Sequence, residues 1–224
     1  MTPKTISHRE LEEMKDGRTR LYLVRHGELT TSQEWRYVGH MDVDLNSAGV
    51  EQLQRLGARL KDETIDVVLS SDLKRTVRSA EIISATIGRS PIPEPDFREI
   101  SLGCWEGMTM NEIVEKFPEE FEKRSLNIAE YRIEGGESFA DVHSRAIPRL
   151  MSYLAEYKGK NILLVAHGGV NRVILCHVLG VSLKNLTRID QSYGCLNIID
   201  YFNGEPVVRL VNESFFAVSP KNGG

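Results

Sequence analysis

Cysteine is scarce in this sequence, and its few copies lie far apart. The three cysteines, Cys104, Cys176 and Cys195, form no C-x-x-C pair. This spacing argues against a disulfide framework and against a paired-cysteine site. We therefore interpret them as reduced, mostly structural thiols.

The sequence also lacks an uninterrupted apolar run and an excess of charge of one sign. Its longest apolar stretch, 161–181, contains His167, Asn171, Arg172 and His177, which excludes a membrane span. The first residues, MTPKTISHRELEEMKDG, hold no apolar core of a secretory signal. Lys and Arg number 28 against 32 Asp and Glu, a net charge of −4 that argues against a nucleic-acid surface. We expect a cytoplasmic protein with neither a nucleic-acid nor a membrane partner.

What the chain does contain is an alternation of apolar strands and amphipathic helices. Buried strands are predicted at about 21–25, 65–70 and 161–166, helices at 47–61, 73–87, 138–157 and 170–179, and antiparallel strands at 195–201 and 206–211. Asn46 or Ser47, then Ser71 with Asp72, then Ser138 with Asp141 are the expected helix caps. The alternation predicts a three-layer α/β sandwich with a mixed, mainly parallel sheet.

The predicted boundaries leave one main domain. Residues 1–18 are expected to be an N-terminal appendage, and 19–215 the domain itself. Within it, 103–134 have mixed helical character and predict a small helical cap insertion over the cleft.

Two of the apolar runs stop on a histidine followed by glycine. LYLVRHG ends at His26 and Gly27, and NILLVAHGG reaches His167 and Gly168. In open α/β sheets, ligands bind beyond the carboxyl ends of the strands. We therefore expect both imidazoles to face one cleft, with Arg25 beside the first.

Other candidate residues extend this cluster. Arg75 follows the second strand, and Glu99 lies at the end of an extended segment. Two arginines and two histidines fit a dianion such as phosphate, and a carboxyl could donate a proton to a departing alkoxide. Taken singly, each has a plainer explanation: Arg75 could pair with Asp72 or Glu81, and Glu99 could be solvated.

Five ordered segments resemble a known family. LVRHGE (23–28), SSDLKRTVRSAE (70–81), REISLGCWEGMT (98–109), GGES (135–138) and VAHGGV (165–170) are similar to the histidine phosphatase, or phosphoglycerate-mutase-like, superfamily. The resemblance spans about residues 20–211 and implies an α/β sandwich with a phosphohistidine mechanism that needs no metal or cofactor.

The resemblance also implies residue roles. His26 would be the nucleophile, Arg25, Arg75 and His167 would hold the phosphoryl oxygens, and Glu99 would be the general acid and then base. Ser32, Gly39 and Gly168 are the further substrate-binding candidates, although family members often carry asparagine at the position of Ser32 and glutamine at that of Val38.

Within the family, the interval from Glu99 to Glu137 is too short for the long insertion of the mutases, which favours a hydrolase. RYVGHMDVDL (36–45) and the segment from Asp190 to Asn212 resemble α-ribazole phosphate phosphatases of the cobalamin pathway. Residues 101–124 and 135–145 resemble fructose-2,6-bisphosphatase-like enzymes, and broad-specificity sugar phosphatases share both features. We favour the α-ribazole hypothesis, with a small phosphorylated metabolite as the ligand and a second copy of the chain as a candidate partner.

Two hypotheses from other classes stay open. A metal-dependent hydrolase could use His26, His167 and either Glu99 or Asp42 as ligands, although the arginines would repel a cation. A non-catalytic binder of phosphorylated ligands would share the same pocket. Among the remaining residues, His40 could lie at the pocket mouth, Trp35, Tyr37 and Trp105 could stack on a leaving group, and Arg132 and Arg145 could meet a second anionic group.

Overall fold

The computed structural model describes residues 17–32, 34 and 36–214 and is built on one six-stranded sheet. The strands are β1 (Thr19–Arg25), β2 (Val67–Ser70), β3 (Pro91–Pro93), β4 (Asn161–Ala166), β5 (Leu196–Phe202) and β6 (Glu205–Glu213). Their order is β3-β2-β4-β1-β5-β6. The first four of these pair in parallel, whereas β5 runs antiparallel to β1 and β6. The predicted mixed, mainly parallel sheet is confirmed.

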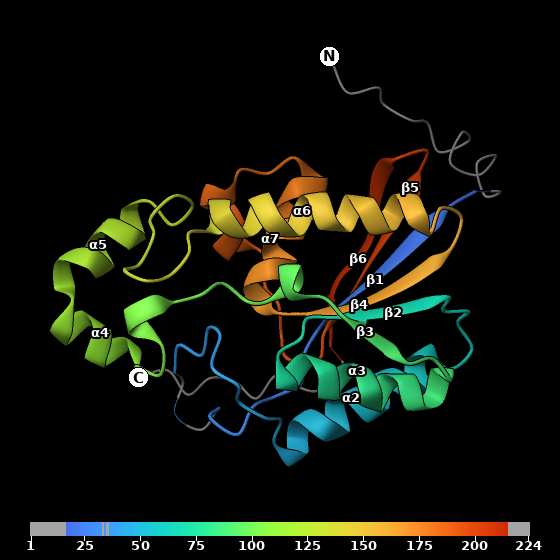
Figure 1. Cartoon of the computed structure of the whole chain (residues 1–224), viewed down its shortest axis with the longest axis horizontal. Helices are drawn as coiled ribbons and strands as arrows, with labels where there is room; N and C mark the ends of the chain where they lie inside the picture. Colours follow the sequence, from blue (N-terminus) through green and yellow to red (C-terminus); the bar gives the residue numbers. More distant parts are fainter. Residues whose placement is uncertain (1–16, 33, 35, 215–224) are drawn as a thin grey trace.

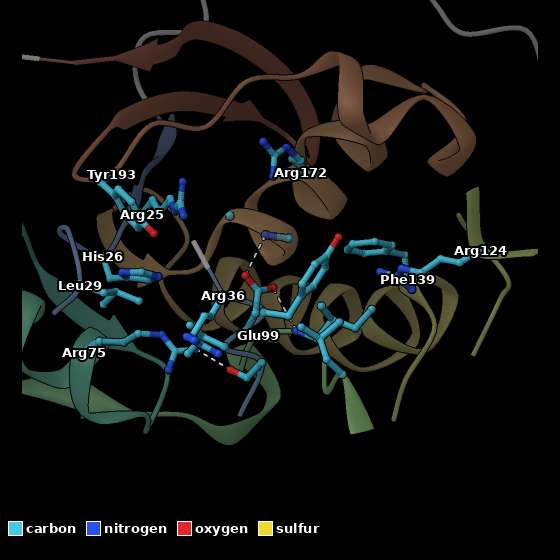
Figure 2. A pocket seen from close by; sticks show the side chains of 17 residues that line it. Arg25, His26, Leu29, Arg36, Arg75, Glu99, Arg124, Phe139, Arg172 and Tyr193 are labelled. Atoms are coloured by element: carbon cyan, nitrogen blue, oxygen red, sulfur yellow. Dashed lines mark hydrogen bonds between the residues drawn. The ribbon is translucent and has the colours of Figure 1, made fainter. Parts of the chain in front are cut away.

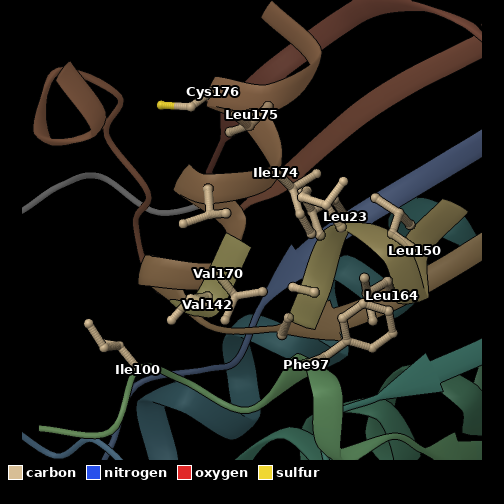
Figure 3. Packing of buried hydrophobic residues seen from close by; sticks show 14 of the residues in the cluster. Leu23, Phe97, Ile100, Val142, Leu150, Leu164, Val170, Ile174, Leu175 and Cys176 are labelled. Carbon is tan, nitrogen blue, oxygen red and sulfur yellow. The ribbon is translucent and has the colours of Figure 1, made fainter. Parts of the chain in front are cut away.

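Helices cover both faces of the sheet (Figure 1). The helices α2 (Ser47–Leu60) and α3 (Lys74–Ile87) lie on one face, and α6 (Phe139–Glu156) and α7 (Gly168–Leu179) lie on the other. Alternate residues of β1 point to opposite faces of the sheet. Leu23 packs in the core beneath α6 and α7 (Figure 3), and Leu21 belongs to the same core. Tyr22 and Val24 pack in the core against α2 and α3. A strand buried on both faces needs a continuous apolar run, which is what LYLV supplies.

Two short helices, α4 (Met110–Lys116) and α5 (Pro118–Leu126), stand outside the sandwich within the segment predicted as a cap. A capping box between Thr109 and Glu112 starts α4, and Pro118 occupies the first turn of α5, where a missing N–H costs nothing. Three 3₁₀ turns, η1 (Pro95–Phe97), η2 (Gly103–Trp105) and η3 (Leu183–Arg188), complete the connections.

The predicted helix starts are confirmed in two cases and wrong in one. Asn46 caps α2 by accepting from the Gly49 amide, and Ser138 caps α6 with Asp141 in a capping box. The prediction that Ser71 and Asp72 cap α3 is wrong: the cap position is Leu73, which makes no side-chain capping bond. The physical reason is competition, because the Asp72 carboxylate accepts two hydrogen bonds from Arg98, at 2.6 and 2.5 Å.

The proline-rich stretch after α3 contains an edge strand. Pro91–Pro93 pairs in parallel with β2. Proline is tolerated there because an edge strand has one row of N–H groups that needs no partner. The predicted appendage, 1–18, falls almost wholly outside the described residues. No helix within the described ranges is both long and apolar enough to cross a bilayer.

Candidate active site

A cavity of about 210 Å³ opens at the carboxyl ends of β1 and β4 (Figure 2). It is lined by five arginines and a single carboxylate, Glu99. The complete lining is Arg25, His26, Leu29, Arg36, Tyr37, Val38, Gly39, Arg75, Glu99, Ile100, Leu102, Arg124, Phe139, Gly168, Gly169, Arg172 and Tyr193. This excess of cationic groups suits an anionic ligand.

The two histidines converge as expected, although His26 lines the cavity and His167 lies buried behind it, outside the lining. His26 follows β1 directly, and its main-chain N–H donates to the Ala166 carbonyl at the end of β4, 3.1 Å away. The ring centroids of His26 and His167 lie 5.2 Å apart. Adjacent parallel strands thus deliver residues 141 positions apart in sequence to one point.

The environment of His26 holds one nitrogen ready to react. Its Nδ1 lies 2.8 Å from the Gly27 carbonyl, to which only a protonated Nδ1 can donate. In the neutral ring this leaves a lone pair on Nε2. Burial lowers the pKa of His26 well below its usual value, and the charges of Arg75 and Arg25 lower this pKa further. The imidazole is therefore neutral and nucleophilic near pH 7.

Arg75 is fixed from two directions. It comes from the first turn of α3, and its Nη1 and Nη2 donate to the carbonyls of Met41 and Gly39, each at 2.7 Å. Its side chain is almost completely buried, and burial lowers its pKa to about 10, so it remains charged at neutral pH. Gly39, predicted to bind substrate, thus contributes a carbonyl that positions Arg75.

Arg25 is also held from outside the cavity. Its guanidinium lies 3.9 Å from the Tyr193 ring centroid, and Nη1 donates to the Gln191 carbonyl. Its Nε is buried and has no hydrogen-bond partner among the described residues. A buried donor without a partner is costly, and a phosphoryl oxygen would satisfy it.

His167 stands in a chain of hydrogen bonds. Nε of Arg75 donates to Nδ1 of His167 at 3.3 Å, which assigns the proton of the neutral ring to Nε2. Nε2 then donates to Oγ of Ser71 at 2.7 Å, and Ser71 donates to Thr76, whose hydroxyl reaches the Leu73 carbonyl. Burial holds the pKa of His167 well below its usual value, and the charge of Arg75 lowers this pKa further.

Glu99 meets the amino end of α7. Its Oε2 accepts from the Gly169 amide at 3.1 Å, and its Oε1 accepts from the Ile100 amide at 3.0 Å (dashed lines in Figure 2). A Cβ on Gly169 would lie 2.3 Å from Oε1 of Glu99, and one on Gly168 would lie 3.3 Å from Nε of Arg25. Two adjacent glycines therefore let the first turn of α7 approach the carboxylate and the arginine together.

Residues that looked peripheral in the sequence hold the Glu99 backbone. The Glu99 carbonyl accepts from Nε2 of His40 at 2.7 Å and from Nη2 of Arg145 at 3.0 Å. Arg145 is itself paired with Glu137 at 2.8 Å. No local motif in the sequence links these positions, so only the tertiary structure identifies them as positioning residues.

Other candidates lie elsewhere. Ser32 does not line the cavity: its hydroxyl donates to Glu28 at 2.8 Å and accepts from Asn46. Trp105 is buried in the core and does not line the cavity, and Arg132 pairs with Asp141. Trp35 lies outside the described residues.

Several lining residues were not predicted as site residues. Arg36 and Arg124 come from the loop after β1 and from the cap, Phe139 begins α6, and Tyr193 precedes β5. A buried arginine within a charged cap segment gives no sequence signal, since EKFPEEFEKR is typical of an exposed helix face. Within the described ranges, no group of three or more His, Cys, Asp or Glu side chains is arranged to hold a metal ion.

Comparison with known proteins agrees with this geometry. The family model described as "Histidine phosphatase superfamily (branch 1)" matches residues 21–214. Phosphoserine phosphatase 1 of Hydrogenobacter thermophilus is 34% identical over 178 residues, which cover 80% of this chain and 82% of the relative. The metal-independent phosphoserine phosphatase of Arabidopsis thaliana is 35% identical over 167 residues, covering 73% and 70% respectively. The solved structure of the alpha-ribazole phosphatase from Shigella flexneri has a TM-score of 0.80 at 27% identity, covering 89% of this chain and 98% of that one.

Proposed function

Because this chain belongs to branch 1 of the histidine phosphatase superfamily and is a phosphatase of that superfamily, we propose that it hydrolyses a small phosphomonoester through a phosphohistidine at His26. The observation that carries the proposal is the neutral His26 ring, whose Nδ1–H is held by Gly27 and whose Nε2 stands beside Arg25 and Arg75.

In the first step, the lone pair on Nε2 of His26 attacks phosphorus, and the bond from phosphorus to the leaving oxygen breaks. Glu99, protonated at this stage, gives its proton to that oxygen, so the product leaves as a neutral alcohol. Arg25 and Arg75 stabilise the charge on the equatorial oxygens and, because neighbouring groups already hold them, need little reorganisation.

In the second step, water replaces the alcohol. The Glu99 carboxylate takes a proton from water, the water oxygen attacks phosphorus, and the phosphorus–nitrogen bond breaks to restore the imidazole. Inorganic phosphate leaves, and Glu99 is again protonated. The amides of Gly169 and Ile100 keep the carboxyl in one place through both transfers.

Two phosphomonoesters are candidate substrates. α-Ribazole phosphate, favoured by the sequence resemblance, is supported by the Shigella structure and by the Tyr37 and Phe139 rings, which could pack on a benzimidazole. O-Phosphoserine is supported by the two phosphoserine phosphatases among the relatives and by the small volume and cationic lining of the cavity.

The test of the phosphohistidine is covalent labelling. Incubation with a phosphate-labelled ester should give an acid-labile, base-stable label on the wild-type protein and none on His26→Ala. His143→Ala removes a histidine outside the cavity and serves as the matched control, with unchanged labelling. A label that persists on His26→Ala would overturn the nucleophile assignment, and loss of activity in a strong chelator would favour the metal-dependent alternative.

A further inference from the structure

We propose that Arg124 forms an anion subsite for a carboxylate on the leaving group, so that the preferred substrates are phosphate esters of small hydroxy acids. This inference rests on the proposed phosphatase function and narrows its substrate class. It concerns the end of the cavity formed by the cap, where Arg124 projects from the last turn of α5 (Figure 2).

Arg124 is a buried cation that has no ionic partner in the part of the chain that the structure describes. Its relative exposure is 7%, and its Nη1 has no hydrogen-bond partner among the described residues. No carboxylate within the described ranges forms an ion pair with it. Burying such a group is costly unless it is paired, so a partner absent from the protein itself is expected to complete the site.

The other cavity arginines already have oxygen partners. Arg36 pairs with Glu34 and Glu112, and Arg172 donates to the Ile189 carbonyl at 2.7 Å. Arg25 and Arg75 each donate to main-chain carbonyls. Of the five cavity arginines, Arg124 is thus the one best placed to bind a second anionic group of the substrate.

Aromatic rings hold Arg124 in place without using its N–H groups. Its Cζ lies 5.5 Å from the Phe139 ring centroid and 6.0 Å from that of Trp105. Contact with a ring face orients a guanidinium plane but leaves donors at its edge available. Burial lowers the pKa of Arg124, and a bound anion would favour its charged form.

The shape of the site favours a carboxylate on a small alcohol. A guanidinium presents a planar fork that matches the two oxygens of a carboxylate. The cavity of about 210 Å³ must hold both the phosphoryl group and the leaving group, and it is smaller than typical pockets for drug-sized ligands. A second phosphate is the other anion with this chemistry, and the experiment separates the two.

The test uses ester pairs that differ at the carboxylate. O-Phosphoserine is compared with O-phosphoethanolamine, and 3-phosphoglycerate with glycerol 3-phosphate; fructose 2,6-bisphosphate represents a second phosphate. Each is assayed with the wild-type protein, Arg124→Met, Arg124→Lys and the control Lys123→Met. Lys123 is the exposed neighbour on the same helix, so its variant removes one positive charge outside the cavity.

For the wild type, kcat/KM should favour the carboxylate member of each pair. Arg124→Met should lower kcat/KM for the carboxylate esters about 10- to 100-fold and leave their partners nearly unchanged. Arg124→Lys keeps the charge without the fork and should fall between, while Lys123→Met should match the wild type.

Three results would overturn the subsite: no carboxylate preference in the wild type, an equal loss on both members of each pair in Arg124→Met, or a preference confined to the bisphosphate. If Arg124→Met does not fold, Arg124→Lys alone decides, since a fork-specific loss appears there too. Failure of the phosphatase function is a different outcome, in which wild-type protein hydrolyses no ester and takes up no label on His26.

Discussion

Oγ of Ser71 lies 2.7 Å from Nε2 of His167 and accepts its hydrogen bond, since Arg75 donates to Nδ1 and thereby leaves the proton of this fully buried imidazole on Nε2. Ser71 follows β2 and His167 follows β4, two strands that pair in parallel. Ser71 therefore helps to position His167, which in turn contacts Arg75 in the cavity lining.

Ser71→Ala should reduce both stability and activity. Losing the acceptor of the buried Nε2–H of His167 costs about 1–2 kcal/mol of unfolding free energy and lowers kcat/KM about tenfold, because the imidazole that contacts Arg75 is held less firmly. Urea denaturation and steady-state kinetics measure the two effects.

The neighbouring serine provides a matched control. Oγ of Ser70 is buried without a hydrogen-bond partner among the described residues, so Ser70→Ala should leave activity unchanged and stability unchanged or slightly higher. Equal losses in the two variants would contradict the role given to Ser71.

Gly169→Ala should impair proton transfer to the leaving group. The added Cβ would lie 2.3 Å from Oε1 of Glu99 and must displace the carboxyl. A displacement near 1 Å lowers kcat for an alkyl phosphate about 100-fold. p-Nitrophenyl phosphate, whose leaving group needs no proton, should lose much less. A uniform loss on both esters would mean that the substitution damages the phosphate pocket instead.

The pH profile should show no acid limb near the usual histidine pKa. Burial and the charges of Arg75 and Arg25 lower the pKa of His26 well below 6.5, so its Nε2 remains unprotonated as the pH falls from 8 to 6. The measurement is kcat/KM against pH. A limb attributable to His26 at about 6.5 would show that the ring is not desolvated as described.

Asp200 is predicted to be a main electrostatic contributor to stability. Its side chain is 2% exposed and pairs with Arg20 at 2.6 Å and Arg209 at 3.0 Å. Burial alone would raise the pKa of Asp200, but the hydrogen bonds from these arginines outweigh it and hold the pKa below its usual value. Its contribution is thus complete above about pH 4, the pKa of an unfolded aspartate, and is lost as the pH falls further.

Asp200→Asn should therefore lower the unfolding free energy at pH 7 by about 1–3 kcal/mol, because Arg20 and Arg209, both partly exposed, lose the carboxylate that they share. Glu51→Gln breaks the exposed pair with Arg55 and should cost at most about 0.5 kcal/mol. Below pH 3.5, the gap between Asp200→Asn and the wild type should narrow. A gap that stays constant with pH would contradict the ionic origin.

Much of the fold could be predicted because local chemistry determines it. Burying the apolar residues of 21–25 and 161–166 is favoured in any fold, and Asn46 and Ser138 provide caps that need only residues three positions away. The start of α3 could not be predicted in the same way, because Arg98, distant in sequence, takes the Asp72 carboxylate that a local rule assigns to the helix.

By itself, the sequence predicted that His26, Arg25, Arg75, Glu99 and His167 would gather at one edge of a sheet, since these residues occur together at or just after the predicted strands and extended segments. Only the tertiary structure decided which nitrogen of each imidazole is protonated, which cavity arginines already have oxygen partners, and that Arg124 has no carboxylate partner among the described residues. These properties depend on hydrogen bonds and burial between residues far apart in the chain, and no local pattern of residue types encodes such contacts.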